Sequence, residues 1–398
     1  MAGAELTELI SKGASPRWQG FAYGSDGMLF VTSENVRDGY LDISSPKFLP
    51  LAFHEKLSRT KLRRDDILVN LVGASIGRSC RVKDDLGCAN VNQAVAVFRL
   101  RDSRSAPYIE YFFQSPATIK RILEMQADAA RPNISLGNLR NFIIVLPPLP
   151  EQQAIAAALS DVDALLGALD RLIAKKRDLK QAAMQQLLTG QTRLPGFSGK
   201  WESGRLEGLS AFITKGSTPT TYGYSWETDG VLFLRSECVS DDGLDLRQSM
   251  FISESAHATL RRSEIRNGDI LMTITGNVGR VVLLADITGT ANINQHIVRI
   301  RIHGDRANPP FVYHFMSQRL IREYYGSITT GQAYPQISLQ QVRKTEVPLP
   351  SLREQKAIAA VLSDMDTELI ALEQRRDKTQ LLKQGMMQEL LAGRTRLV

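Results

Sequence analysis

The chain is poor in residues that bind metals or form structural disulfides. It has only three cysteines and five histidines among 398 residues. The cysteines, Cys80, Cys88 and Cys238, lack metal-ligand spacing and are odd in number, which favours a reduced, cytoplasmic setting without structural disulfides. The histidines show no zinc spacing either. We therefore expect no bound metal ion.

Long apolar runs are also missing. No run approaches the roughly 18 residues of a membrane span, and the first residues lack the basic-then-apolar pattern of a secretion signal. We expect no membrane association. Hydrophobic residues make up 43% and charged residues 23% of the chain, which argues against wholesale disorder. The formal net charge of +7 favours a polyanionic partner such as nucleic acid without requiring one.

What the sequence does contain is an internal repeat. Residues 147–163 read PPLPEQQAIAAALSDVD and residues 350–366 read PSLREQKAIAAVLSDMD, an offset of 203 positions. The offset falls to 202 where Asn92-Gln93 aligns with Asn294-Gln295, and it then returns to 203. The chain is therefore a tandem duplication. Between the matched segments the copies differ freely, so we expect two similar scaffolds that act on different targets.

Residues 1–146 and 195–349 have the same kind of sequence pattern. Short β-branched runs separated by Gly, Asn and Asp predict an α+β globule in each copy. The run from Ile297 to Ile302 alternates with period two, as a half-buried strand does. One helix is expected in each globule, from Pro107 to about Met125 and from Pro310 to about Tyr325, because proline suits the first turn.

Residues 151–189 and 354–392 predict long helices, since neither contains a proline and Gly190 and Gly393 are natural stops. Each would have about 39 residues and a length of roughly 58 Å. Apolar residues at alternating spacings of four and three form the a/d seam of a coiled coil. The seam comprises Ile155, Leu159, Val162, Leu166, Leu169 and Ile173, and then Ile358, Leu362, Met365, Leu369 and Leu372.

A narrow seam on a long helix needs a partner, and the other copy supplies one. We expect an antiparallel intramolecular coiled coil that relates the two copies by a pseudo-twofold and separates the globules. The alternative is two separate coiled coils with external partners. The predicted fold is α+β, with two tandem recognition globules separated by two long helices.

The order of globule, long helix, globule and long helix resembles the specificity subunit of type I restriction–modification systems. The resemblance is carried by Pro-x-Leu-x-Glu-Gln at both helix entrances, residues 147–152 and 350–355, and by Leu-Ser-Asp-x-Asp at 159–163 and 362–366. Lys-Gly-x-x-Pro at 12–16 and 215–219 and the turn at 275–280 add to it. It covers essentially the whole chain.

The resemblance implies a DNA-binding protein without catalysis of its own. Each globule would be a target-recognition domain for one half of a split, asymmetric site in double-stranded DNA. The helices would set the gap and dock two DNA methyltransferase (modification) subunits. Endonuclease/translocase (restriction) subunits would join for cleavage, and the assembled complex would methylate adenine and cleave DNA.

The repeat and the resemblance together set the predicted domain boundaries. We expect a first recognition domain at 1–146, a central helical spacer at 147–194, a second recognition domain at 195–349 and a C-terminal helical spacer at 350–398. Trp201 opens the second copy, but its counterpart would precede Met1, so the first globule is expected to lack an opening strand or packing tryptophan. Residues 395–397 could pack where residues 192–194 lead into the second globule.

Candidate DNA contacts fall into two groups. The glycine-containing turns at 73–78 and 276–280 each end in arginine, which suits either a loop over the DNA backbone or a tight strand turn. Loops that differ between the copies are favoured for base recognition. The expected DNA-binding residues are Lys12, Arg17, Trp18, Ser75, Arg78, Arg131, Asn133, Lys215, Thr218, Tyr222, Tyr224, Trp226, Asn277, Arg280, Thr330, Gln332 and Tyr334.

The sequence offers two alternative functions. The tetrapeptide at 308–311 reads NPPF, as in amino-methyltransferases, but the first copy reads SAPY and no glycine-rich nucleotide loop precedes it. We interpret it as a helix start, and we expect no cofactor and no catalytic residue. A DNA adenine methyltransferase would need a nucleotide fold that the sequence does not display. A coiled-coil scaffold with protein-binding globules would show no sequence-specific retention of DNA.

Overall fold

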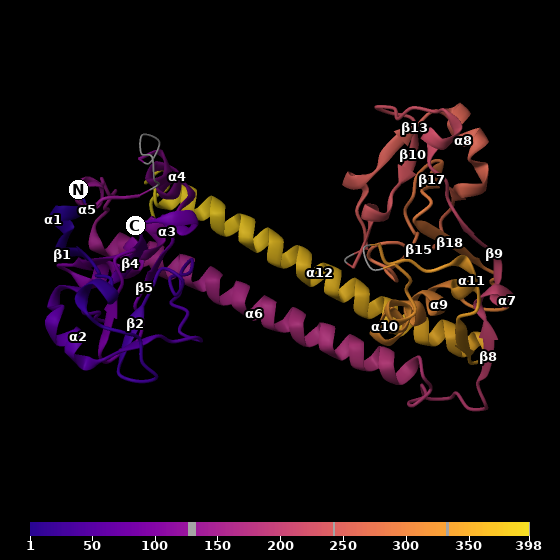
Figure 1. Ribbon diagram of the computed structural model, residues 1–398, viewed down its shortest axis with the longest axis horizontal. Coiled ribbons are helices and arrows are strands. Elements are labelled where there is room, and N and C mark those ends of the chain that lie inside the picture. The colour runs from indigo at the N-terminus through magenta and orange to yellow at the C-terminus, as the bar shows by residue number, and fades with distance from the viewer. Residues whose placement is uncertain (126–132, 242, 332–333, 398) are drawn as a thin grey trace. The chain divides into compact units, whose positions relative to one another are not determined.

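The computed structural model describes residues 1–125, 133–241, 243–331 and 334–397. They form two compact units (Figure 1): Met1–Asp170 with Gln374–Val398, and Arg171–Glu373. Each unit holds one globule and part of each long helix. Within the described ranges, no helix is both long and apolar enough to cross a membrane.

The globule of the first unit is built on a four-stranded antiparallel sheet in the order β1-β7-β4-β5, beside a three-stranded sheet β3-β2-β6 whose β2 and β6 are parallel. The strands are β1 (Thr7–Lys12), β2 (Met28–Val31), β3 (Phe48–Leu49), β4 (Ile67–Asn70), β5 (Ser79–Arg81), β6 (Ala89–Val91) and β7 (Val95–Leu100). The helices are α1 (Gly3–Leu6), α2 (Leu51–Lys56), α3 (Ala106–Gln114), α4 (Pro116–Glu124) and α5 (Leu136–Asn141).

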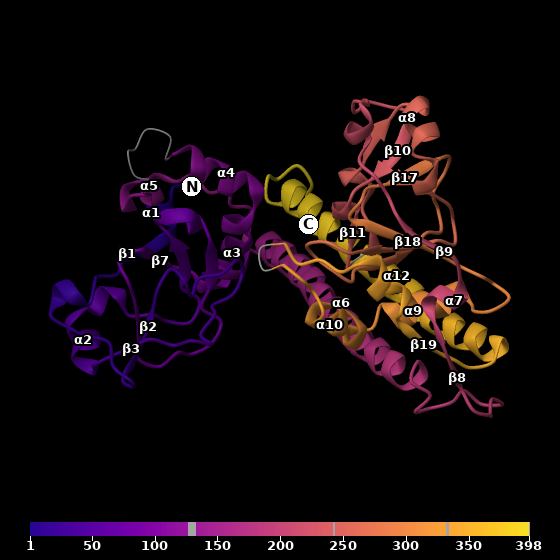
Figure 2. The ribbon, with the colours of Figure 1, turned by 45° about the vertical axis from the view of Figure 1, so that its right-hand side comes forward.

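The second globule repeats this plan with the sheets β9-β18-β15-β16 and β13-β10-β17-β14, and adds the pairs β11-β12 and β8-β19. The strands are β8 (Glu202–Arg205), β9 (Ser210–Lys215), β10 (Val231–Leu234), β11 (Val239–Ser240), β12 (Gly243–Leu244), β13 (Met250–Ile252), β14 (Glu264–Ile265), β15 (Ile270–Thr273), β16 (Val281–Leu283), β17 (Ala291–Ile293), β18 (Ile297–Ile302) and β19 (Glu346–Leu349). The helices are α7 (Leu206–Leu209), α8 (Glu254–Thr259), α9 (Pro309–Met316), α10 (Arg319–Ser327) and α11 (Leu339–Arg343). Figure 2 shows α8 beside β10 and β17, at the other end of this unit from α9.

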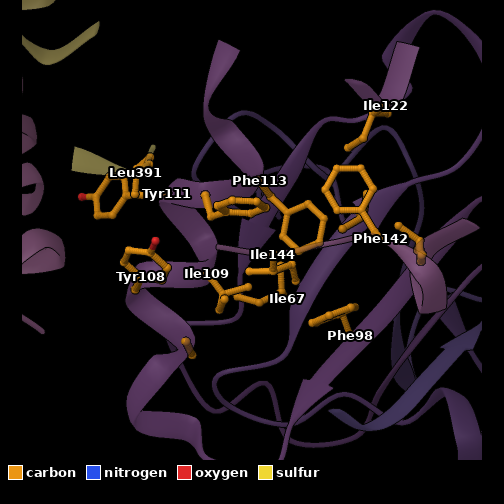
Figure 3. Packing of buried hydrophobic residues seen from close by; sticks show 14 of the residues in the cluster. Ile67, Phe98, Tyr108, Ile109, Tyr111, Phe113, Ile122, Phe142, Ile144 and Leu391 are labelled. Atoms are coloured by element: carbon orange, nitrogen blue, oxygen red, sulfur yellow. The ribbon is translucent and has the colours of Figure 1, made fainter. Parts of the chain in front are cut away.

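Apolar side chains bury both faces of the main sheet in each globule. In the first, the β7 residue Phe98 packs edge-on against Phe113 of α3, with ring centroids 5.4 Å apart, and Phe113 stacks on Phe142 at 6.2 Å. Figure 3 shows Tyr111 of the same helix beside Leu391, which follows α12 (Leu352–Leu390). The core of the first globule is thus continuous with the end of a long helix.

The prediction of a single helix in each globule is wrong in one respect, because two consecutive helices occupy this segment. In the first copy α3 stops at Gln114 and α4 starts at Pro116, because a residue before proline is disfavoured in the α region, and Ser115 is extended. Ser115 also caps α4 by accepting a hydrogen bond from the Thr118 amide at 3.2 Å. The second copy breaks without a proline, at the extended and buried Gln318.

The strand expected at Ile297–Ile302 is present as β18, but its alternate residues are not all exposed. Arg299, predicted to lie on a solvent face, retains 6% of its accessible surface. The sheet packs on the second face as well, so the half-buried interpretation fails at this residue.

The long helices are present as α6 (Leu149–Leu187) and α12, each with 39 residues, and each begins two residues earlier than expected. In the second unit Lys180 of α6 forms an ion pair with Asp366 of α12. In the first unit Lys383 of α12 reaches Asp163 of α6 at 2.6 Å. Because these pairs exchange equivalent positions of the repeat, the helices run antiparallel and pair with each other within each unit. The two-separate-coils alternative is therefore not the structure of this chain.

Most residues of the predicted seam are buried, and Ile155, Leu159, Ile358 and Leu362 belong to clusters that include the cores of the globules. Seven of its residues are buried: Ile155, Leu159, Leu169, Ile173, Ile358, Leu362 and Leu369. Val162, Leu166, Met365 and Leu372 are half-buried.

The Glu-Gln motif at each helix entrance ties the start of one helix to the chain beyond the other. Glu354 accepts two hydrogen bonds from Arg193, and Glu151 accepts two from Arg396. Arg396 thus takes the place in the first unit that Arg193 takes in the second, as the repeat suggested. The glutamine amides donate to the carbonyl oxygens of Pro147 and Pro350 at 2.8 and 2.9 Å.

The opening strand differs between the globules as expected. In the second unit β8 pairs with β19 over four residues. In the first unit a bridge between Ala2 and Ile143 takes this place, with backbone hydrogen bonds that join Met1 to Ile144 and Gly3 to Phe142. Trp201 lies over Arg193 at 5.4 Å, and the matching position in the first copy would precede Met1.

Candidate nucleic-acid interface

One end of the main sheet gathers the predicted contact segments of each globule. In the second globule β9 and β15 end there, at Lys215 and Thr273, while β18 begins there at Ile297. Lys215 lies opposite Val298, and Thr273 lies opposite Ile297. The first globule has the same arrangement. Loops that are distant in sequence therefore leave each sheet side by side.

The Lys-Gly-x-x-Pro segment is held against the sheet by its glycine. A Cβ atom added to Gly216 would lie 1.8 Å from the carbonyl oxygen of Ile293, and one added to Gly13 would lie 1.8 Å from that of Val91. The lysine before each glycine is exposed. Thr218 donates to the Gln295 side chain, which joins this segment to the turn before β18.

The aromatic residues predicted for recognition separate into exposed and packed ones. Trp18, beside Arg17 in a short 3-10 turn, is 86% exposed, and Tyr222 is exposed in the matching turn of the second copy. Trp226 instead packs edge-on against Phe233, with centroids 5.2 Å apart. Tyr224 shares a 2.7 Å hydrogen bond with Thr259. Trp18 and Tyr222 are thus open to solvent, whereas Trp226 and Tyr224 contact other residues of the globule.

The arginine-ending turns follow β4 and β15 and carry an internal counter-ion. Arg78 lies 3.9 Å from Asp38, and Arg280 lies 3.2 Å from Asp241, the equivalent carboxylate of the second copy. The turn of the first copy has one residue more than that of the second, and from this point the offset between the copies is 202 and not 203. Asn277 is exposed, whereas the Ser75 hydroxyl accepts a hydrogen bond from Asn70 at 3.1 Å.

A second predicted loop lies directly against this turn. The Gly276 amide donates to the Pro335 carbonyl at 2.9 Å, and Thr330 and Gln336 exchange backbone hydrogen bonds of 3.0 Å. Tyr334 is 74% exposed at its tip. The first globule pairs Val72 with the exposed Asn133 in the same way. The structure thus brings two predicted segments together; the predicted Arg131 and Gln332 lie outside the described residues.

Three asparagines, Asn92, Asn294 and Asn308, serve the scaffold. Asn92 and Asn294 each accept a backbone hydrogen bond two residues on, at 3.0 and 3.1 Å, as expected for turn asparagines. Asn308 of the NPPF tetrapeptide accepts from the Phe311 amide at 3.1 Å and caps α9, as its interpretation as a helix start requires.

A buried ion pair that the sequence did not single out lies in each main sheet. Arg301 donates to both oxygens of Asp269 at 2.6 and 2.7 Å, and Arg99 does the same to Asp66 at the same distances. These hydrogen bonds raise the pKa of both guanidinium groups. The sequence signal for this pair is the shared Asp-Ile-Leu run at 66–68 and 269–271, which precedes each glycine-containing turn.

Comparisons of this chain with known proteins agree on one family. Residues 27–175 and 198–383 match the type I restriction modification DNA specificity domain. The type I restriction enzyme MjaVIII specificity subunit of Methanocaldococcus jannaschii is 22% identical over 383 residues, which cover 92% of this chain and 86% of that protein. The EcoBI specificity subunit of Escherichia coli is 23% identical over 76% of this chain and 68% of its own.

Solved structures share the fold. A chain from a study of complex assembly and conformational transition of the type I R-M system superposes with a TM-score of 0.63 at 18% identity, covering 98% of this chain and 96% of that one. The type I restriction–modification S subunit from M. genitalium gives a TM-score of 0.59 at 16% identity, over 98% and 95% of the two chains.

Proposed function

The chain belongs to the type I restriction–modification DNA specificity family, and on that premise we propose that it is the sequence-recognition subunit of such a complex. Each globule contacts one half of a bipartite, asymmetric site in double-stranded DNA. The observation that carries this proposal is the sheet end on which separate loops converge in both globules. Its scaffold is shared, but one copy exposes Trp18 there and the other exposes Tyr222 and Tyr334.

The division of contacts follows from the chemistry of these side chains. The exposed lysines at the ends of β1 and β9 and the arginines of the glycine turns supply sequence-independent phosphate contacts. The loops that differ between the copies supply base contacts and set the two half-sites apart. Arg78 and Arg280 would exchange part of their interaction with Asp38 and Asp241 for DNA phosphates.

The partners follow from the family. We propose that α6 and α12 dock two DNA methyltransferase subunits, that restriction subunits join for cleavage, and that this chain contributes recognition and no catalytic group. The proposed domains are residues 1–146 and 195–349 for recognition, with 147–194 and 350–398 as helical spacers. A cytoplasmic location is part of the same proposal.

Exchanging one globule tests the assignment of half-sites. Residues 195–349 would be replaced by the matching segment of a relative with a different site, and methylated bases would be mapped with the cognate modification subunit present. One half of the site should change, and the other half and the gap should stay. A change in both halves, or in neither, would contradict independent recognition by the two globules.

The spacer proposal has a separate test. Matched insertions of about seven residues in α6 and α12 add two turns, or roughly 10 Å, to each helix. The gap should lengthen by about three base pairs at 3.4 Å per pair, with both half-sites unchanged. The control is the same number of residues inserted between Gly196 and Gly199, outside the helices, which should leave the gap unchanged. Altered half-sites with an unaltered gap would contradict the spacer role.

A further inference from the structure

The second globule carries a strongly basic concave site that includes none of the predicted DNA-contact residues. Its volume is about 800 Å³, and β9, β18, the segment before β14 and α11 line it. Six arginines surround it: Arg261, Arg262, Arg266, Arg299, Arg301 and Arg343. We call this the Arg299 pocket. Two carboxylates, Glu207 and Glu264, also line it, and Glu264 is paired with Arg266 at 3.0 Å.

Arg299 is a buried cation that forms no direct ion pair among the described residues, although the charges of Asp269 and Glu264 lie near it. Its terminal nitrogens donate to the backbone carbonyls of Glu264 and Arg262, and its Nε has no hydrogen-bond partner. Among the described residues, no carboxylate lies within ion-pair distance of Arg299. Burial lowers the pKa of its guanidinium group. A buried charge that lacks a partner is unfavourable, and an anion in the pocket would relieve that cost.

In the first globule, a carboxylate of the chain itself lies on the equivalent face of the main sheet. Glu8 lies at the bulge of β1, 3.6 Å from Arg63 and 4.0 Å from Arg99. The equivalent bulge position of β9 is Ala211, which offers no charge. The position of Arg299 is occupied in the first copy by Val97. At these two positions the second globule lacks a carboxylate and has an additional arginine, while Glu207, Arg261 and Glu264 of its lining stand where the first copy has Ala4, Ser58 and Lys61.

The neighbouring groups suit a small multivalent anion. Arg261 and Arg262 are exposed at the rim, Arg343 is half-exposed, and none of the three has an ion-pair partner among the residues with described side chains. Planar guanidinium groups match the geometry of phosphate oxygens in paired hydrogen bonds. The Phe212 ring lies 5.0 Å from Arg299 and 5.2 Å from Arg301 and holds both over the site.

We propose that the Arg299 pocket of the second globule binds a phosphate oxyanion, either free phosphate or a phosphate group of DNA. The first globule does not share this site, because Glu8 and Val97 replace Ala211 and Arg299. Binding of free phosphate needs neither DNA nor partner subunits, so this proposal can be tested independently of the recognition function.

The test uses the full chain and inorganic phosphate. Phosphate binding is measured by calorimetric titration, and the unfolding temperature is compared in phosphate and chloride at equal ionic strength. Ala211→Glu imports the carboxylate of the first copy, and Arg299→Met removes the buried cation. Each should weaken phosphate binding by at least about tenfold, because Ala211→Glu adds a negative charge at the pocket and Arg299→Met removes a charged hydrogen-bond donor. The control is Arg319→Met, which removes an exposed arginine paired with Glu323 and should bind phosphate like the wild type.

A second arm identifies the source of the phosphate. If the site takes a DNA phosphate, Ala211→Glu also weakens binding to a random-sequence duplex and lowers the salt slope by about one. If it takes free phosphate, duplex binding stays unchanged while phosphate binding is lost. Equal phosphate affinity in the wild type, Ala211→Glu and Arg299→Met would overturn the proposal. A missing methylation motif would contradict the recognition function and leave this result untouched.

Discussion

At the scale of single residues, Gly216 shows why a short motif recurs in both copies. Its amide donates to the Asn294 carbonyl at 3.1 Å, and its missing side chain lets the chain cross the end of β17. Any Cβ there would collide with backbone, which cannot move as a side chain can. The Lys-Gly-x-x-Pro segment thus requires glycine because its backbone passes close to the backbone at the end of β17. The lysine before the glycine is exposed and free to face a ligand.

Gly216→Ala should therefore destabilise the second globule. We expect a loss of about 3 kcal/mol, at the upper end of the usual range for overpacking, because the clash is with the Ile293 carbonyl. Denaturant unfolding followed by circular dichroism measures it. Gly208→Ala, where an added Cβ meets nothing within 4 Å, is the matched control and should be nearly neutral. Equal losses in the two variants would contradict this account of the motif.

His314 gives the second unit a dependence on pH. It is buried beside Ser363, with Asp366 3.9 Å away and Lys180 nearby, and burial lowers its pKa from 6.5 to about 4. Above pH 6.5 the histidine is neutral in both the folded and the unfolded chain and contributes nothing. As the pH falls from 6.5 towards 4, the unfolded chain takes up the proton first, so stability is lost. The loss at pH 4 should be on the order of 3 kcal/mol.

The repeat offers a variant that removes this titration. Tyr111 occupies the equivalent position in the first copy and donates to Asp163 at 2.8 Å, so His314→Tyr should find Asp366 in the same place. Unfolding free energies of the wild type and His314→Tyr would be compared between pH 7 and pH 4. The difference between the two proteins should shift steadily in favour of the variant as the pH falls. A pH-independent difference would show that His314 does not titrate in this window.

At the scale of elements, the long helices are fixed at their entrances by buried glutamates. Glu354 is 1% exposed and Glu151 is 2% exposed, and each is held by an arginine from beyond the end of the other helix. The hydrogen bonds from Arg396 lower the pKa of Glu151. The Glu-Gln motif has the same position in both copies, because each glutamate joins the start of one helix to the chain beyond the end of its antiparallel partner.

Arg193→Met should lower the stability of the second unit by leaving Glu354 without its partner. Adding Glu354→Gln to this variant should restore part of the loss, because the uncompensated charge is removed. The matched control is Arg177→Met, whose exposed pair with Glu373 should contribute less than about 1 kcal/mol. Thermal unfolding of these variants and of Glu354→Gln alone measures the coupling. Additive effects of Arg193→Met and Glu354→Gln would mean that the two residues do not act as a pair.

The sequence allowed the long helices, their seam and the duplicated globules to be predicted, because periodicity and repetition extend over tens of residues. It did not reveal the break at Gln318, where no proline marks the end of a helix. It also placed Arg299 on a solvent face, since alternation shows which residues share a face and not what covers that face. The counter-ions of Arg78 and Arg280 come from distant segments, so no local pattern indicates them.

At the scale of the whole molecule, the duplication explains how one chain serves two related targets. Both units contain the same four-stranded main sheet, the same glycine approach and mirrored ion pairs between α6 and α12. Their differences are concentrated in exposed loops and in the Arg299 pocket. Two related scaffolds with unlike surfaces should select two unlike half-sites, which makes the complete site asymmetric.

The central claim is tested most directly by mapping methylated bases in DNA from cells that express this chain with its cognate modification subunit. Long-read sequencing should find one split, asymmetric motif with N6-methyladenine in both halves and a fixed gap. A methyltransferase that binds this chain yet leaves no such motif would contradict its assignment as a recognition subunit.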